Sequence, residues 1–127
     1  MKYFHYKILI FALFRHIIIF ICCIIHAKGG DNMSNIKVHN INGTSGRKPN
    51  DGSDDWLDFW EAHHTSTVTY CQDTSCTNKK EVGAHVQKDG KDDDKYWYIV
   101  PLCKACNAKT VPFSVPENML VRITDTN

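Results

Sequence analysis

Four cysteines in the C-terminal half of this 127-residue chain are arranged as two closely spaced pairs. Cys71 and Cys76 have four residues between them, and Cys103 and Cys106 have two. Such short spacings allow both thiolates of a pair to point at one position, and two pairs together form the tetrahedral ligand set of structural Zn²⁺. We therefore predict that these four sulfur atoms hold one structural zinc ion.

Two disulfide bonds are the alternative use of four cysteines in a secreted protein. A Cys-x2-Cys pair rarely closes as a local structural disulfide, however, and Cys103 and Cys106 follow a β-prone segment in the manner of a zinc knuckle. The two remaining cysteines, Cys22 and Cys23, lie in an apolar N-terminal run and belong to neither arrangement. Detection of a bound metal ion would distinguish zinc coordination from the two disulfide bonds.

The two pairs must be brought together by the 26 residues between them. That stretch contains two strand-like segments, Val-Gly-Ala-His-Val (82–86) and Tyr-Trp-Tyr-Ile-Val-Pro-Leu (96–102). The charged segment 88–95 joins them and is typical of a solvated hairpin tip, so we interpret the aspartates at 92–94 as solvated charge rather than a metal site. We expect a central β-hairpin between the two knuckles.

One helix is expected before the hairpin, in segment 53–64. Ser53 is its predicted N-cap, because a serine hydroxyl can accept a hydrogen bond from the free N–H groups of the first turn. Trp56 and Trp60 stand four residues apart and form an apolar stripe. We expect this stripe to cover the core of the domain.

The segment after the second cysteine pair predicts a pair of short strands. Pro112 limits any helix after Cys106 to one or two turns. Two short β-prone runs follow, at 112–115 and 119–124. The fold class expected from all these elements is α+β: a small treble-clef-like zinc module with one preceding helix, a hairpin between two zinc knuckles and a C-terminal strand pair.

Composition divides the chain into three parts. Residues 53–127 form the predicted zinc-binding domain. Residues 33–52 are rich in Asn, Gly, Ser and Asp and are expected to be an irregular arm.

Without the first 32 residues the chain has 11 basic and 13 acidic side chains. It therefore lacks the basic excess that non-specific nucleic-acid binders normally have.

Residues 1–32 form a hydrophobic leader that we exclude from the fold. The run 8–25 is apolar apart from Arg15 and His16. Three interpretations are open: an upstream extension that is not translated, a signal peptide, or a membrane anchor. If translation starts at Met33, we expect a cytoplasmic protein. If it starts at Met1, we expect a protein that is membrane-anchored or exported. The protein would bind a membrane only if residues 8–25 are a real anchor.

The order of these motifs resembles the cysteine-rich branch of the HNH nucleases, which are treble-clef zinc fingers. The resemblance covers about 71–110 and consists of Cys-x4-Cys, then Gly-Ala-His-Val, then Ile-Val-Pro-Leu-Cys-x2-Cys-Asn. It implies a structural zinc on the four cysteines and a separate catalytic Mg²⁺ or Mn²⁺. It also implies that His85 is the general base for phosphodiester hydrolysis and that Asn107 matches the last residue of the motif.

The sequence departs from this family at two points. Ala84 stands where the family usually has an aspartate or histidine, and a methyl group cannot coordinate a metal ion. Pro112 also breaks the helix that continues in the family. His63 or His64 is a candidate for the missing ligand. Alternatively, His85 has only an architectural role beside the zinc site.

The sequence also resembles small uncharacterised bacterial zinc-binding proteins that share Trp-x3-Trp and both cysteine motifs. This second resemblance covers most of 53–124 and implies that the helix and the zinc core form one module.

We expect a zinc-stabilised, non-catalytic binding module whose partner is a protein or a nucleic acid. The alternative is a minimal HNH-type metal-dependent endonuclease with His85 as general base.

Overall fold

The computed structural model describes residues 33–90 and 95–124, which belong to one compact unit. The expectations for the leader 1–32 and for the aspartates at 92–94 concern residues outside this part. No helix within the described ranges is long and apolar enough to span a bilayer.

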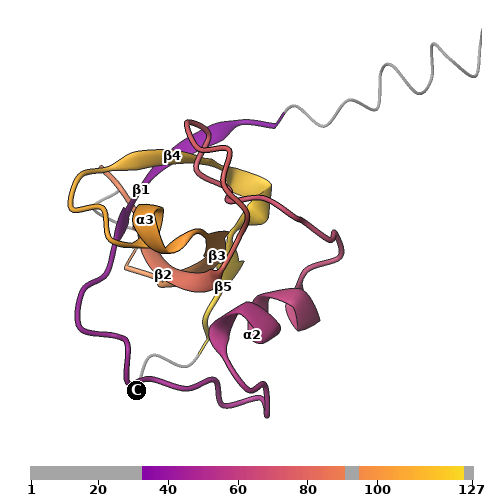
Figure 1. The fold of residues 1–127 in the computed structure, drawn as a ribbon. Helices are drawn as coiled ribbons and strands as arrows, with labels where there is room; N and C mark the ends of the chain where they lie inside the picture. The colour runs from indigo at the N-terminus through magenta and orange to yellow at the C-terminus, as the bar shows by residue number, and fades with distance from the viewer. Residues whose placement is uncertain (1–32, 91–94, 125–127) are drawn as a thin grey trace, which may run out of the picture. The chain divides into compact units, whose positions relative to one another are not determined.

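Five antiparallel strands form one curled sheet in the order β4-β1-β2-β3-β5 (Figure 1). The strands are β1 (Asn35–Asn40), β2 (Val82–Lys88), β3 (Tyr98–Leu102), β4 (Phe113–Pro116) and β5 (Val121–Arg122). The helices are α2 (Trp56–His63), α3 (Lys104–Asn107) and the short 3₁₀ helix η1 (Glu117–Met119). The predicted class, a small α+β fold, is confirmed.

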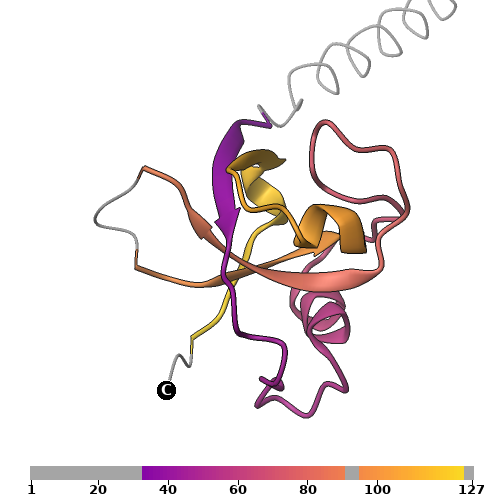
Figure 2. The same cartoon turned by 60° about the vertical axis from the view of Figure 1, so that its left-hand side comes forward.

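The predicted hairpin is present as β2 and β3, which pair from Val82 with Leu102 to Val86 with Tyr98. Every residue of β3 is buried, because the hairpin is covered on both faces. α2 lies on one face and α3 on the other (Figure 2). This double cover explains why Tyr98–Leu102 is continuously apolar rather than alternating.

Side chains of β3 therefore enter two different hydrophobic clusters. Val100 and Leu102 pack with the cysteines in one cluster, and Ile99 packs with Trp60 in the other. Successive residues of a strand point to opposite faces, which assigns them to alternate clusters. The hairpin is thus the shared wall between the cysteine side and the α2 side of the domain.

Helix α2 begins later than the sequence suggested. Its N-cap is Asp55 rather than Ser53, because the Asp55 carboxylate accepts hydrogen bonds from the backbone N–H groups of Leu57 and Asp58 at 2.8 and 2.9 Å. The expected packing role of its tryptophans is confirmed for Trp60, which is fully buried and donates its indole N–H to the carbonyl of Met119 at 2.7 Å.

The expectation of an irregular arm is wrong for Asn35–Asn40, which forms strand β1. This strand lies inside the sheet, between β4 and β2, and its Val38 is fully buried. Only two apolar residues, Ile36 and Val38, alternate in this segment, so local periodicity was too short to identify it. Its hydrogen-bond partners are more than 40 residues away in sequence, in β2 and β4.

The two C-terminal strands exist, but they do not pair with each other. β4 pairs with β1 and β5 pairs with β3, so they form opposite edges of the sheet. Helix η1 lies between them in sequence. The backbone N–H and C=O groups of these strands are satisfied by partners distant in sequence, which local patterns do not specify.

Gly83 on β2 lies directly under the N-terminus of α2. A Cβ atom at this position would overlap the backbone of Trp56 and Leu57. We predict that Gly83→Ala lowers the free energy of unfolding by about 1–3 kcal/mol, because the helix must move away from the sheet. Urea denaturation measures this change.

Gly46→Ala is the matched control, because no atom lies within 4 Å of a Cβ at that position and its φ is not positive. Equal stabilities of the two variants would contradict the close contact between α2 and β2.

Candidate metal centre

The four cysteines predicted as ligands come together at one point. Their sulfur atoms all lie within 4.8 Å of one another, and the Sγ atoms of Cys76 and Cys103 are 3.8 Å apart. A tetrahedral ion with Zn–S bonds of about 2.3 Å requires sulfur separations of about 3.8 Å. All four thiols are free, so none of these residues is joined by a disulfide bond. Four cysteines placed in this way can bind a metal ion.

The first pair is supplied by the loop that precedes β2. The N–H of Cys71 donates to the carbonyl of Asn78 at 2.9 Å, and the N–H of Cys76 donates to the carbonyl of Asp73 at 3.0 Å. The Asp73 carboxylate accepts hydrogen bonds from both the backbone N–H and the hydroxyl of Ser75. These bonds close a tight turn that turns both thiols toward the same side.

The second pair lies at the junction of β3 and α3. Cys103 is the N-cap of α3, and its sulfur accepts a hydrogen bond from the N–H of Cys106 at 3.4 Å. Cys106 lies one helical turn further on, which brings its sulfur back over the same point. The helix α3 has four residues and begins between the two cysteines, so it contains Cys106 rather than following it.

Hydrogen bonds and burial act in opposite directions on the thiol acidities. Burial raises the pKa of Cys71 and of Cys106, because the charged thiolate loses hydration. For Cys103, burial also raises the pKa, but the N–H of Cys106 and the Asn78 amide outweigh it and lower the pKa to about 7. Several thiolates this close repel one another, and a cation at their centre removes that repulsion.

Three residues that sequence reasoning missed, Asn40, Asp73 and Lys109, fasten the site to the rest of the domain. The Asn40 amide, at the end of β1, donates to the carbonyls of Cys106 and Lys109 at 2.9 and 3.0 Å. The Lys109 ammonium makes an ion pair with the buried Asp73 carboxylate at 2.5 Å. Burial opposes ionisation of Asp73, but Lys109 and Ser75 outweigh it and lower its pKa to about 2.

A partial signal for one of these residues was present in the sequence. Asp73 lies two residues before a serine and inside a cysteine turn, a pattern typical of an aspartate that caps a loop. Asn40 has no such signal, because its partners are 66 and 69 residues away.

His85 is buried in the middle of β2, with an exposed fraction of 6%. Its Nδ1 shares a hydrogen bond of 3.2 Å with the hydroxyl of Thr44, and its ring packs edge-to-face on Trp56 at 4.6 Å. Its Nε2 is buried without a hydrogen-bond partner among the described residues. Burial, with a smaller contribution from the charge of Arg47, lowers the pKa of His85 to about 4.

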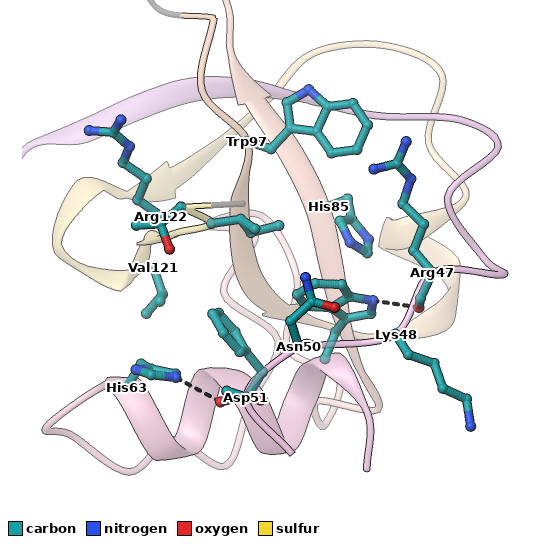
Figure 3. A pocket seen from close by; sticks show the side chains of 13 residues that line it. Arg47, Lys48, Asn50, Asp51, His63, His85, Trp97, Val121 and Arg122 are labelled. Carbon is teal, nitrogen blue, oxygen red and sulfur yellow. Dashed lines mark hydrogen bonds and ion pairs between the residues drawn. The ribbon is translucent and has the colours of Figure 1, made fainter. Parts of the chain in front are cut away.

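The other candidate residues of the nuclease hypothesis are distributed around His85. Asn107 is exposed on α3 and lines the same cavity as His85, one of about 410 Å³. The ring of His63 shares a hydrogen bond of 2.7 Å with the Asp51 carboxylate, and His63 lines a second cavity that His85 also borders (Figure 3). His64 stacks on Trp60 instead, with ring centroids 4.3 Å apart.

Within residues 33–90 and 95–124, one group of at least three His, Cys, Asp or Glu side chains is placed so that it could share a metal ion. This group consists of the four cysteines. No protein-family model, curated protein or solved structure matches this chain. The resemblance to HNH nucleases and to the treble clef therefore depends on the sequence motifs alone.

The shifted pKa of His85 predicts a pH-dependent stability. The folded protein keeps His85 neutral down to about pH 4, whereas the unfolded chain protonates it below about 6.5. Because the unfolded state binds the extra proton, the free energy of unfolding falls as the pH drops through this window, by about 2–3 kcal/mol in total. Above pH 6.5 this contribution is fully present.

His85→Asn removes the titrating group, while its amide can still bond the Thr44 hydroxyl. We expect a flatter stability profile between pH 7 and 5 in this variant, measured by urea denaturation. Both proteins retain the same cysteines, so any loss of bound metal affects both. Parallel profiles would contradict the buried, neutral state of His85.

Proposed function

We propose that the chain is a zinc-stabilised binding module in which Cys71, Cys76, Cys103 and Cys106 hold one structural Zn²⁺. The observation that carries the proposal is the convergence of four sulfur atoms within 4.8 Å. An all-thiolate tetrahedral set favours zinc, with iron as its main competitor. Three of the four cysteines are buried, and all four coordination positions come from protein, as in structural rather than catalytic zinc sites.

The order of elements supports a treble-clef-like arrangement. A cysteine turn comes first, the β2–β3 hairpin follows, and α3 carries the last ligand in its first turn. In this arrangement the ion joins the loop 71–79 to α3 and adds to the hydrogen bonds by which Gln72 and Thr74 bind β3 and β4. The metal then contributes directly to the folding free energy, as it does in small zinc modules.

Binding a partner, either a protein or a nucleic acid, is favoured over catalysis by the surroundings of His85. A general base works best with a pKa near the operating pH, whereas burial holds the pKa of His85 at about 4. The neighbouring Ala84 is buried and offers only a methyl group. The ring is also held in place by Thr44 and Trp56.

Metal analysis tests the zinc assignment. We expect one zinc atom per chain, and a chelator should unfold the protein. Cys76→Ser should lose the metal and most of the folding free energy. It is the informative substitution, because Cys76 is the least buried of the four and its replacement disturbs packing least.

Ser66→Ala is the control and should retain full metal content, because Ser66 is exposed and lies outside the four-cysteine group. Protein that contains no metal, or iron in place of zinc, or that unfolds with a reductant but not with a chelator, would contradict the zinc assignment.

A second candidate function is the minimal HNH-type endonuclease, which one observation favours. His85 and Asn107 border one cavity, together with the carboxylates of Asp55 and Glu81. Both carboxylates already have structural partners, since Asp55 caps α2 and Glu81 accepts a hydrogen bond from the backbone N–H of Lys104 at 2.8 Å. Catalysis would need at least one of them to turn toward an added Mg²⁺ or Mn²⁺.

A plasmid-nicking assay with Mg²⁺ or Mn²⁺ separates the two functions. For the binding module we expect no cleavage that depends on His85, so wild type and His85→Ala should behave alike. His39→Ala is the control, because His39 is an exposed histidine on β1 that borders neither cavity. Metal-dependent cleavage that His85→Ala reduces by about 100-fold or more, and His39→Ala does not, would establish the nuclease instead.

A further inference from the structure

The four cysteines differ in how far solvent reaches them. Cys71, Cys103 and Cys106 are buried, whereas Cys76 is half-buried and keeps part of its surface open to water. Exposure is one of the conditions that select a cysteine for oxidation, because the oxidant must touch the sulfur. A dissolved reagent therefore meets Cys76 before it meets the other three.

The Sγ of Cys76 lies 3.8 Å from the Sγ of Cys103, which belongs to the other cysteine pair. Sulfurs joined in a disulfide are about 2.05 Å apart, so these two would have to approach by about 1.8 Å. Residues 71–78 contain no helix or strand. A shift of Cys76 toward Cys103 thus interrupts neither a sheet ladder nor a helical turn.

Asn78 contacts both sulfurs of this pair. Its backbone N–H donates to the Sγ of Cys76 at 3.4 Å, and its side-chain amide donates to the Sγ of Cys103 at 3.8 Å. The N–H of Cys106 also donates to the Sγ of Cys103, at 3.4 Å. These donors hold the two sulfurs side by side, one at the surface and one beneath it.

We propose that Cys76 and Cys103 form a peroxide-sensitive pair, which is oxidised to a disulfide bond and thereby releases the zinc ion. Cys76 provides the sulfur that reacts with a hydroperoxide, and Cys103 provides the sulfur that closes the bond. This inference rests on the proposed zinc module and adds a site of oxidation to it.

Hydrogen peroxide is the oxidant, and two displacement steps complete the reaction. The Cys76 thiolate attacks one peroxide oxygen, so that an S–O bond forms, the O–O bond breaks and hydroxide leaves. The Cys103 thiolate then attacks the sulfur of the resulting sulfenic acid, so that an S–S bond forms, the S–O bond breaks and a second hydroxide leaves. The two sulfurs together lose two electrons, and these reduce the peroxide.

The disulfide removes two of the four metal ligands. Only a thiolate binds zinc, and neither sulfur of a disulfide is a thiolate. The chain then offers only Cys71 and Cys106, whereas a structural zinc site needs four protein ligands. We therefore expect release of the ion to accompany formation of the bond. The S–S bond still joins the loop 71–79 to the start of α3.

Disulfide mapping of the zinc-loaded full chain tests this pairing. The protein is treated with hydrogen peroxide, its remaining thiols are alkylated, and it is digested with trypsin and endoproteinase Asp-N. Cleavage before Asp73 and after Lys104 places each of the four cysteines on its own peptide, apart from the two N-terminal cysteines. We expect the peptide that contains Cys76 to be joined to the peptide that contains Cys103.

Zinc release is measured in the same reaction with a chromogenic chelator. We expect one zinc ion to be released for each disulfide bond that forms. Dithiothreitol with added Zn²⁺ should restore the original zinc content, because a disulfide is reduced by thiols whereas a sulfinic acid is not.

Cys76→His and Cys71→His are matched variants that locate the reactive sulfur. Each replaces one thiolate with an imidazole, and three cysteines with one histidine also form a structural zinc site. Cys76→His lacks the reactive sulfur, so peroxide should release its zinc at least about tenfold more slowly than it does from the wild type. Cys71→His keeps both Cys76 and Cys103, so its zinc should be released at about the wild-type rate.

The oxidation proposal is overturned if peroxide joins a different pair of cysteines, if the disulfide forms without release of zinc, or if the two histidine variants release zinc at the same rate. Mapping of the wild-type chain decides the question should either variant fail to bind zinc. One zinc per chain before treatment, with no bond between Cys76 and Cys103 after it, contradicts the oxidation proposal alone and leaves the zinc-stabilised module standing. Absence of zinc before treatment contradicts the module itself.

Discussion

The close approach of four sulfur atoms is the constraint around which the described domain is arranged. Two turns that are 26 residues apart in sequence must place their cysteines within 4.8 Å of one another. Thiolates at that separation repel, and burial further disfavours their charge. The arrangement is stable only if the hairpin holds the turns in register and a cation, or protons, neutralises the sulfurs.

The β2–β3 hairpin satisfies this constraint because it is buried on both faces. Its pairing from Val82 with Leu102 to Val86 with Tyr98 fixes where Cys103 lies relative to the first turn. Helix α2 then covers the face opposite the cysteines, where Trp60 is fully buried. Gly83 permits the close approach of this helix, because any side chain there would meet its backbone. The cysteine side and the α2 side therefore depend on the same two strands.

His85 lies on β2 in this shared wall, and its side chain packs against Trp56 of α2. Its neighbours are Thr44, Trp56 and Trp97, and none of them is a metal ligand of the cysteine group. Burial keeps its ring neutral, which suits a hydrogen-bonding role better than proton transfer at neutral pH. The cavity that His85 shares with Asn107 is bordered by carboxylates that already cap or bond backbone groups.

The sequence by itself determined the features that are encoded within a few neighbouring residues. The paired cysteine spacings identified the sulfurs that meet, and the turn residues and apolar run identified the hairpin, because short-range geometry dictates both. The tertiary structure alone decided that Asn35–Asn40 is an inner strand, that β4 and β5 lie at opposite edges, and that Asn40 and Lys109 fasten the cysteine turns. Each of these depends on partners distant in sequence, and a backbone group or buried charge reveals its partner only when the chain is folded.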